Sequence, residues 1–377
     1  MPIPKELREL AEQGDPNIQC LVATVYWDEA KTEAEYKNAL AWYKLAAEKN
    51  IAEAQFMMGV AYDEGKGVVQ DSKESFNWYK LSAEQNNLQA MFNLGYSYEF
   101  GIGTEKDLDK AVEWYIKCAN LGEPKAEYCL AEIYAFEDEY PHDYRKAYEL
   151  FEKAAAQGHK VAQFKLAIMY QEGLGIDGPN DFMAFQSLKK SAGLGYSPAR
   201  QILGEIYQSG GPYQEKDIKK AFEQYQLAAQ EMYTPALRAL GICYLYGTGT
   251  EQNNDKAFIL LSEAAKDGDA AAMNSLSIMY HNGIGTKKDD KMAADLLIKA
   301  SEYGCTAAMS NLGVFYSLGI GVKKDTQKAK ELLTHAAKDG YEIAEANLKA
   351  LENGADSTRL VIKDGDDLKQ CQIDEKK

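Results

Sequence analysis

Alanines recur along the chain at steps of 36 or 37 residues, and each begins the same pattern of apolar and polar positions. The anchors are Ile18 and then Ala54, Ala90, Ala126, Ala162, Ala199, Ala236, Ala272, Ala308 and Ala344. An apolar residue follows each of the first nine anchors after four positions and a small residue after five. A tyrosine follows after eight, at Tyr26, Tyr62, Tyr98, Tyr134, Tyr170, Tyr207, Tyr244, Tyr280 and Tyr316. Offsets 0, 4, 5 and 8 share one face of a helix with 3.6 residues per turn, so each frame is predicted to open with an amphipathic helix, the A helix.

A second helix, the B helix, is predicted in the other half of each frame. It begins near a small residue such as Ala39, Ser75 or Ala111 and closes on a pair of small residues. Between these marks the early frames carry Trp-Tyr and the last three carry Leu-Leu, all of which are large apolar pairs. Glycine pairs such as Gly65 and Gly67 end most A helices, and because no strand precedes them we interpret them as turns rather than a phosphate-binding loop. A single helical hairpin cannot bury its apolar face, so the hairpins are expected to stack on one another.

The frame AMFNLGYSYEFGIGTEKDLDKAVEWYIKCANLG resembles the Sel-one-like repeat, a relative of the tetratricopeptide repeat. The pattern covers residues 15–353, nearly the whole chain. The resemblance implies an all-α fold, a right-handed superhelical solenoid of about nine helix-turn-helix repeats that scaffolds protein complexes or regulates a partner. We expect the solenoid over residues 1–354, with a lone B helix before the first repeat and a lone A helix over 341–353. Residues 355–377 leave the pattern and are expected to form a mobile tail.

Composition and charge narrow the class of partner. No apolar run approaches the about 20 residues that span a bilayer, and the polar N-terminus does not resemble a signal peptide, so we expect a cytoplasmic protein without membrane insertion. A secreted branch of the family has a cysteine in each repeat at positions that correspond to Ala119 and Glu127 here. Because this chain has no cysteine at these positions, the resemblance argues against secretion. The net charge is −16, of which residues 1–150 carry −13, with 15 Lys and Arg against 28 Asp and Glu. An acidic surface repels phosphate backbones, so we expect no nucleic acid and favour a protein or peptide with a basic segment.

Candidate chemistry is sparse. The six cysteines lack the spacing of a disulfide framework or zinc site, and the four histidines lie in four different repeats, so no metal and no cofactor are expected. Ser187 and Lys190 match the SxxK motif of β-lactamase-like enzymes, but no SDN or KTG accompanies them. We therefore do not predict an enzyme, and a β-lactamase-like hydrolase is a remote alternative. An immunity-type inhibitor of a toxin or enzyme is a second alternative.

The predicted binding surface lies on the A helices, opposite their core face. Offsets 2, 6, 9 and 10 point there, and in related solenoids the A helices line a concave groove. In the second to fifth repeats these offsets hold aromatic and acidic residues, namely Phe56, Asp63, Glu64, Phe92, Tyr96, Glu99, Phe100, Tyr128, Glu132, Phe136, Phe164 and Glu172. Such a mixture suits a partner with lysine or arginine beside apolar anchors. The aromatic residues at offset 2 have an alternative role, packing against the adjacent repeat.

Three irregular loops are further candidates for recognition. The fourth repeat replaces its glycine pair with the acidic, aromatic run FEDEYPHDYRK, and the fifth and sixth each add one residue before the B helix. Loops are where a solenoid varies without losing its stack. Neutral variation of solvated loops is the alternative explanation.

Overall fold

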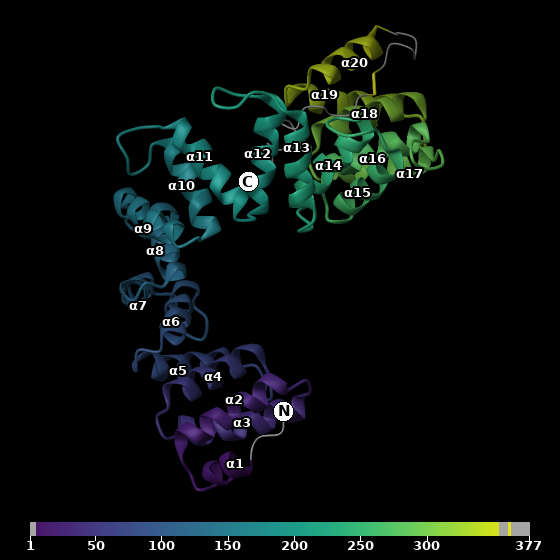
Figure 1. Cartoon of the computed structure of the whole chain (residues 1–377). Coiled ribbons are helices and arrows are strands. Elements are labelled where there is room, and N and C mark those ends of the chain that lie inside the picture. The colour runs from purple at the N-terminus through teal and green to yellow at the C-terminus, as the bar shows by residue number, and fades with distance from the viewer. Residues whose placement is uncertain (1–4, 354–360, 363–377) are drawn as a thin grey trace. The chain divides into compact units, whose positions relative to one another are not determined.

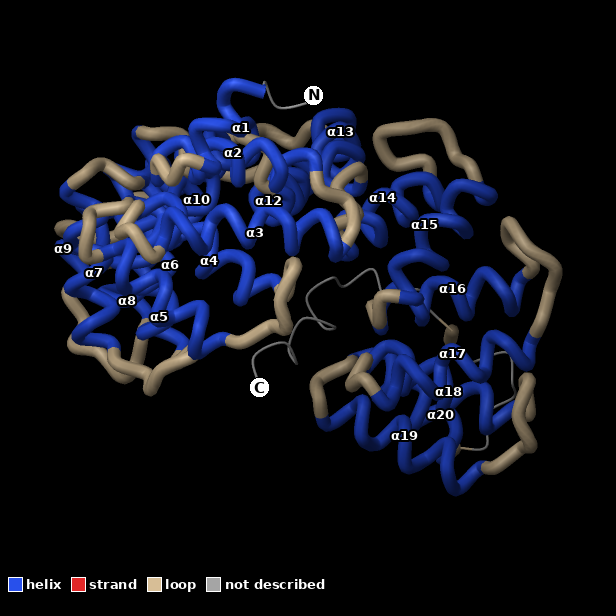
Figure 2. Tube along the Cα trace, turned by 90° about the horizontal axis from the view of Figure 1, so that it is seen from below, coloured by secondary structure: helices blue, strands red, loops and turns tan. Residues whose placement is uncertain are grey.

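The computed structural model describes residues 5–353 and 361–362, and the described chain consists of helices and loops (Figures 1 and 2). The helices are α1 (Lys5–Glu12), α2 (Pro16–Glu29), α3 (Glu33–Ala47), α4 (Ala52–Glu64), α5 (Ser72–Ala83), α6 (Leu88–Phe100), α7 (Leu108–Asn120), α8 (Pro124–Phe136), α9 (Tyr144–Ala156), α10 (Lys160–Glu172), α11 (Asp181–Gly193), α12 (Ser197–Ser209), α13 (Ile218–Ala229), α14 (Thr234–Tyr246), α15 (Asn254–Lys266), α16 (Ala270–Asn282), α17 (Asp290–Glu302), α18 (Thr306–Leu318), α19 (Thr326–Lys338) and α20 (Glu342–Glu352). The prediction of an all-α solenoid of A and B helices is confirmed, with α1 and α20 as the lone helices at the two ends. Most of the tail, residues 355–360 and 363–377, lies outside the described residues.

The chain divides into two compact units, Met1–Ser187 and Leu188–Lys377. Unit 1 contains α1 to α10, and unit 2 contains α12 to α20. Successive helices pack against one another from α1 to α10 in unit 1 and from α12 to α20 in unit 2, so each A helix between two B helices of its unit contacts both. No helix among the described residues is long and apolar enough to cross a membrane.

The column of small residues lets the two helices of a repeat approach closely. A Cβ on Gly95 of α6 would lie 2.8 Å from the Tyr115 ring, and a Cβ on Gly59 of α4 would lie 2.5 Å from the Tyr79 ring. Tyr115 is fully buried beneath this contact. The small residue five positions after the anchor is therefore required by the large residue of the B helix.

An aspartate before each of several B helices joins that helix to the preceding A helix. Asp107 caps α7 by accepting a hydrogen bond from the Lys110 N–H at 3.0 Å, and its own N–H donates to the Tyr98 carbonyl oxygen at 2.8 Å. The cap pairs a backbone donor that has no partner inside the helix. The same backbone tether recurs at Asp71, Asp143, Asp217, Asp289 and Asp325.

The tyrosine column lies between successive repeats. The Tyr98 ring packs edge-on against Phe76 of α5 in the preceding repeat, at a centroid distance of 5.3 Å. Its other side is covered by the Lys110 ammonium, 5.2 Å from the ring centroid. Most of these tyrosines are half-buried. Tyr170, Tyr207 and Tyr316 are buried, at 8–9% exposed.

Candidate functional site

The predicted binding residues lie on α4, α6, α8 and α10 of unit 1, and we call this the unit 1 A-helix surface. Six of the twelve are exposed: Asp63, Glu64, Tyr96, Phe100, Phe136 and Glu172. The other six are half-buried: Phe56, Phe92, Glu99, Tyr128, Glu132 and Phe164. The exposed aromatic residues are confined to α6 and α8.

The aromatic residues at offset 2 pack inside their own repeats. The Phe92 ring lies 5.7 Å from Tyr115, and the Phe56 ring lies 5.9 Å from Tyr79. Tyr128 lies against Phe151 in the same way, at 6.0 Å. These three rings therefore pack against the B helix of their own repeat, rather than against the adjacent repeat as in the alternative role.

The most exposed aromatic pair on this surface is Tyr96 and Phe100 on α6. Their ring centroids are 4.5 Å apart, and the residues are 44% and 56% exposed. They are one helical turn apart, so both rings lie on the same side of α6. Exposed aromatic rings that contact each other offer a large apolar area to a partner at a small cost in side-chain entropy.

Glu99 lies beside this pair and is held from below by Tyr115 of the B helix. The Tyr115 hydroxyl donates to Glu99 Oε2 at 2.7 Å. Burial raises the pKa of Glu99 above its ordinary value, and the hydrogen bond from Tyr115 opposes that rise. Glu99 is therefore a positioned acceptor whose carboxylate is poorly solvated.

On the next repeat the same surface already binds a lysine of the chain itself. Lys165 of α10 places its Nζ 2.9 Å from Glu132 Oε2 and 4.6 Å from the centroid of Phe136, both on α8. Burial raises the pKa of Glu132, and the hydrogen bond from Lys165 opposes that rise. A carboxylate and an aromatic face thus form a lysine site between two successive A helices.

Phe100 lacks the equivalent lysine. Lys165 lies three residues after its anchor Ala162, and the matching residue after Ala126 is Cys129. Burial raises the pKa of the Cys129 thiol to about 12, so the side chain is neutral. Phe100 is more exposed than Phe136, at 56% against 38%.

The two ends of the surface are less distinctive. Glu64 on α4 is paired with Lys66, at 2.5 Å between Oε2 and Nζ. Asp63 beside it has a raised pKa because it is partly buried and lies near Glu64. Glu172 at the end of α10 is exposed. The surface is therefore acidic from α4 to α10, with its exposed aromatic residues in the middle.

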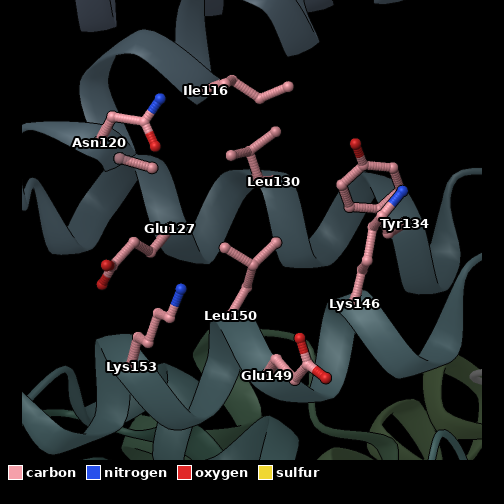
Figure 3. A pocket seen from close by; sticks show the side chains of 10 residues that line it. Ile116, Asn120, Glu127, Leu130, Tyr134, Lys146, Glu149, Leu150 and Lys153 are labelled. Carbon is pink, nitrogen blue, oxygen red and sulfur yellow. The ribbon is translucent and has the colours of Figure 1, made fainter.

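A pocket of about 320 Å³ lies elsewhere in unit 1, among α7, α8 and α9 (Figure 3). Glu127 is buried at one end, where it accepts a hydrogen bond from Gln157 Nε2 at 2.8 Å, and burial raises its pKa. A pocket of equal volume lies at the matching positions of α17, α18 and α19, with Met309 in the place of Glu127. Because the pocket recurs in register with different chemistry in its lining, the repeat geometry explains it, and we assign it no role.

The residues considered for chemistry lie apart from this surface. Ser187 is 3% exposed in α11, so its hydroxyl is not accessible to a substrate. His281 pairs with Asp290, at 2.6 Å between Nδ1 and Oδ1. Within residues 5–353 and 361–362, no group of three or more His, Cys, Asp or Glu side chains could hold a metal ion.

Sequence reasoning missed three residues of the site, namely Tyr115, Cys129 and Lys165. Each lies at a core or neutral offset of its own repeat. Only the contact between repeats, or between the two helices of one repeat, brings it to the surface residues. The repeat itself was the available signal. Lys165, three residues after its anchor, contacts Glu132 and Phe136, which lie six and ten residues after the previous anchor.

The fold and this surface define a helical repeat protein of the solenoid class. The family model of the Sel1 repeat matches nine segments, at residues 19–51, 52–87, 88–123, 124–159, 160–196, 197–231, 234–269, 270–304 and 306–341. The chain belongs to the Sel1 repeat family, whose members generally mediate protein–protein interaction and are generally not enzymes. The predicted resemblance is thus confirmed.

Several solved structures are similar to this chain, whereas no curated protein matches it. The structure of c5321, a protective antigen in uropathogenic Escherichia coli strains that displays an SLR fold, has 30% sequence identity and a TM-score of 0.74, over 94% of this chain and 76% of that one. A Sel1 repeat protein from Oxalobacter formigenes has 28% identity and a TM-score of 0.44, over 92% of this chain and 89% of that one. The immunity protein Pa5087 from Pseudomonas aeruginosa has 20% identity and a TM-score of 0.37, over 57% of this chain and 81% of that one. These last two likenesses add nothing on function.

Proposed function

We propose that the chain is a scaffold or regulatory adaptor that binds a partner protein through the exposed aromatic residues of α6 and α8. The partner contributes a segment that carries lysine or arginine. The observation that carries this proposal is the pair of neighbouring sites on the unit 1 A-helix surface. Glu132 and Phe136 hold Lys165. At the matching place beside Phe100 the chain carries Cys129 instead of a lysine, and Glu99 precedes that ring in the sequence.

A basic side chain of the partner that binds beside Phe100 gains two contacts there. A cation over an aromatic face contributes about 0.5–2 kcal/mol, depending on how far it is desolvated. The Tyr96 and Phe100 rings supply the apolar contact around it, and the Glu99 carboxylate supplies charge. The acidic surroundings speed the encounter with a basic partner, so binding is expected to weaken as the ionic strength rises.

The experiment is affinity purification from the source organism followed by mass spectrometry. The bait proteins are the natural chain, a Tyr96→Ala and Phe100→Ala double variant, and a Tyr246→Ala control. Tyr246 ends α14 in unit 2, at the same repeat position as Phe100, and is 52% exposed. The control therefore loses an exposed aromatic ring of similar size that lies away from the proposed site. All three baits are expected to have the same circular dichroism and melting temperature, because none of these rings belongs to the buried core.

The double variant is expected to lose proteins that the natural chain and the control both retain. Equal recovery of every protein by the double variant and the natural chain would refute the proposed site. Loss of the same proteins by the control would refute it as well, since it would show that any exposed ring suffices.

A further inference from the structure

The residue three positions before an anchor immediately precedes the A helix and can cap it with its side chain. Within residues 5–353, five of these residues accept a hydrogen bond from a main-chain N–H of the first turn, namely Asp15, Asn87, Glu123, His159 and Asp269. Such a cap pairs an N–H that has no carbonyl partner inside the helix. Histidine is the only one of these residue types whose charge ordinarily changes in the neutral range of pH.

His159 connects two successive A helices of unit 1, α8 and α10. Its Nδ1 accepts a hydrogen bond from the Ala162 N–H at 3.1 Å and so caps α10. Its ring stacks on Tyr128 of α8, with the ring centroids 4.7 Å apart and an angle of 24° between the planes. Tyr128 in turn lies against Phe151 of α9, at 6.0 Å. One imidazole therefore takes part both in the packing on α8 and in the start of α10, and we call these contacts the His159 joint.

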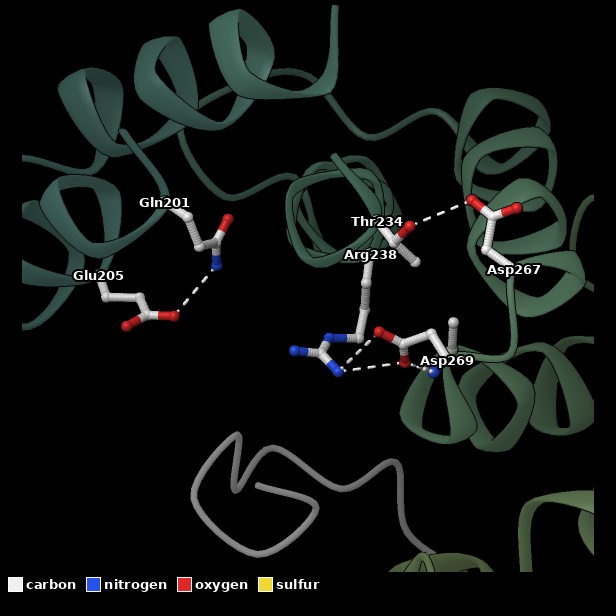
Figure 4. A network of polar contacts seen from close by, with 7 residues as sticks. Gln201, Glu205, Thr234, Arg238, Asp267 and Asp269 are labelled. Carbon is white, nitrogen blue, oxygen red and sulfur yellow. Dashed lines mark hydrogen bonds and ion pairs between the residues drawn. The ribbon is translucent and has the colours of Figure 1, made fainter. Parts of the chain in front are cut away.

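The joint between α14 and α16 in unit 2 uses the same repeat positions with two charged side chains (Figure 4). Asp269 accepts a hydrogen bond from the Ala272 N–H at 2.7 Å and so caps α16. It also accepts hydrogen bonds from Arg238 Nη1 at 3.0 and 3.1 Å, and Arg238 has the repeat position of Tyr128. Arginine and aspartate, as residue types, both keep their charge from neutral pH to about pH 5. The unit 2 joint is therefore expected to keep its cap over that range.

Protonation of His159 removes the acceptor on which the cap of α10 depends. A protonated imidazole carries a hydrogen on both nitrogens, so Nδ1 can no longer accept from the Ala162 N–H. The helix dipole also opposes a positive charge at a helix N-terminus. The stack on Tyr128 acts in the opposite direction, because an aromatic face attracts a cation. Burial lowers the pKa of His159, Lys125 lowers it further and Glu123 opposes both, so the neutral ring that caps the helix is favoured.

Other charged groups at this joint lie on all three helices that meet there. On α8, Glu132 accepts a hydrogen bond from Lys165 of α10 at 2.9 Å. On α9, the charge of Lys153 acts on Glu127, and Lys160 is the first residue of α10. Burial raises the pKa of Glu132, so this carboxyl also titrates above its ordinary range. A test of the imidazole must therefore separate its protonation from that of Glu132.

We propose that His159 is a pH sensor that controls the opening of the joint between the fourth and fifth repeats. At a pH above about 6.5, the ordinary pKa of histidine, the neutral ring caps α10 and the joint is closed. Below that pH the imidazole binds a proton more readily when the cap is open, so acidification favours opening of the first turn of α10. Lys165 lies in the next turn, where it contacts Glu132 and Phe136. The sensor therefore acts beside the lysine site of the unit 1 A-helix surface.

The test is hydrogen–deuterium exchange with mass spectrometry on the natural chain and on His159→Asn, at matched values from about pH 8 to about pH 5. Asparagine caps a helix without titrating, as Asn87 does by accepting from the Ala90 N–H at 2.9 Å. The ratio of the two exchange rates for amides 162–166 removes the intrinsic effect of pH on exchange and the effect of Glu132, which both proteins retain. This ratio, natural chain over variant, is expected to rise about 2- to 30-fold toward low pH, the factor that corresponds to the loss of one N-cap.

Two controls accompany this comparison. His335→Asn removes an imidazole of unit 2 whose side chain is 65% exposed, so α10 is expected to keep the pH response of the natural chain. The first amides of α16, which Asp269 caps, are an internal reference and should show no rise in the ratio. Circular dichroism and the melting temperature check that His159→Asn is folded. His159→Asp, which places the residue type of Asp269 at this joint, is the second variant and should remove the response as well.

Three results would overturn the proposal. A ratio for amides 162–166 that stays constant with pH, in both His159 variants, shows that the imidazole does not control the joint. An equal rise at the start of α16 shows a general loosening in acid. Loss of the α10 response in His335→Asn assigns the sensor to another histidine. None of these results depends on whether a partner binds the unit 1 A-helix surface.

Discussion

Two glycines at the end of α6 allow the stacking of repeats to be measured separately from backbone strain. Gly101 and Gly103 have nearly the same left-handed conformation, with φ of +68° and +69°. A Cβ on Gly101 would lie 3.2 Å from the nearest atom, Lys106 N of the same loop. A Cβ on Gly103 would lie far inside van der Waals contact of the Ser72 carbonyl oxygen, at the start of α5 in the preceding repeat. Alanine at the two positions therefore differs mainly in the contact between repeats.

The expected costs follow from these geometries. Forcing alanine into the left-handed region costs about 1–2 kcal/mol at either position. The entropy that alanine removes from the unfolded chain is the same for both variants and cancels in their difference. Gly103→Ala also presses against backbone that cannot change rotamer, and overpacking of this kind costs about 1–3 kcal/mol. We expect Gly101→Ala to destabilise by about 1–2 kcal/mol and Gly103→Ala by about 2–5 kcal/mol.

The assay is urea unfolding followed by circular dichroism, with the slope of the transition checked for equality between variants. Gly247 and Gly249 at the end of α14 repeat the comparison in unit 2, because a Cβ on Gly249 meets the Ile218 carbonyl oxygen whereas one on Gly247 has no atom nearer than 3.4 Å. Equal unfolding midpoints for the two members of a pair would refute the reasoning, since they would show that the second glycine is needed only for its conformation.

Three further predictions concern charged groups. Glu99→Gln should raise the melting temperature relative to the natural chain at pH 7 and lose that advantage toward pH 4. Burial raises the pKa of Glu99, so ionisation of this carboxyl destabilises the folded chain above that pKa. Below the ordinary pKa of a glutamate the carboxyl is protonated in both the folded and the unfolded chain, and the penalty disappears. Asp269→Asn should destabilise the chain by about 3–5 kcal/mol in urea unfolding, because it leaves the Arg238 guanidinium buried without its carboxylate, whereas the asparagine still caps α16. Lys165→Met should raise the pKa of Glu132 further, as followed by carboxyl NMR titration, and should cost about 1–3 kcal/mol by removing a charge-assisted hydrogen bond.

The helices and their stacking were predictable because the same packing requirement recurs in nine repeats of the sequence. The small residue at Gly95 and the large residue at Tyr115 each have a fixed place in the frame, so their contact follows from the pattern. The glycine pair at the end of most A helices similarly marks the turn that follows. A requirement that recurs in every repeat is visible without coordinates.

Features that occur once were not predictable in the same way. The pairing of Lys165 with Glu132 joins residues 33 positions apart, and that of Arg238 with Asp269 joins residues 31 apart. Asn347 bonds a segment outside the repeats altogether. Such contacts depend on which side chains lie opposite each other in neighbouring repeats. The sequence therefore predicted which residues form the surface, but not which of its charged side chains pair with one another.

The most direct test of the proposed function is hydroxyl-radical footprinting of the chain alone and in complex with a purified partner. Oxidation of Tyr96, Phe100 and Phe136 is expected to fall in the complex, while that of Tyr246 stays unchanged, because only the first three rings lie on the proposed surface. Unchanged oxidation of the three rings in a saturated complex would place the partner elsewhere and contradict the account.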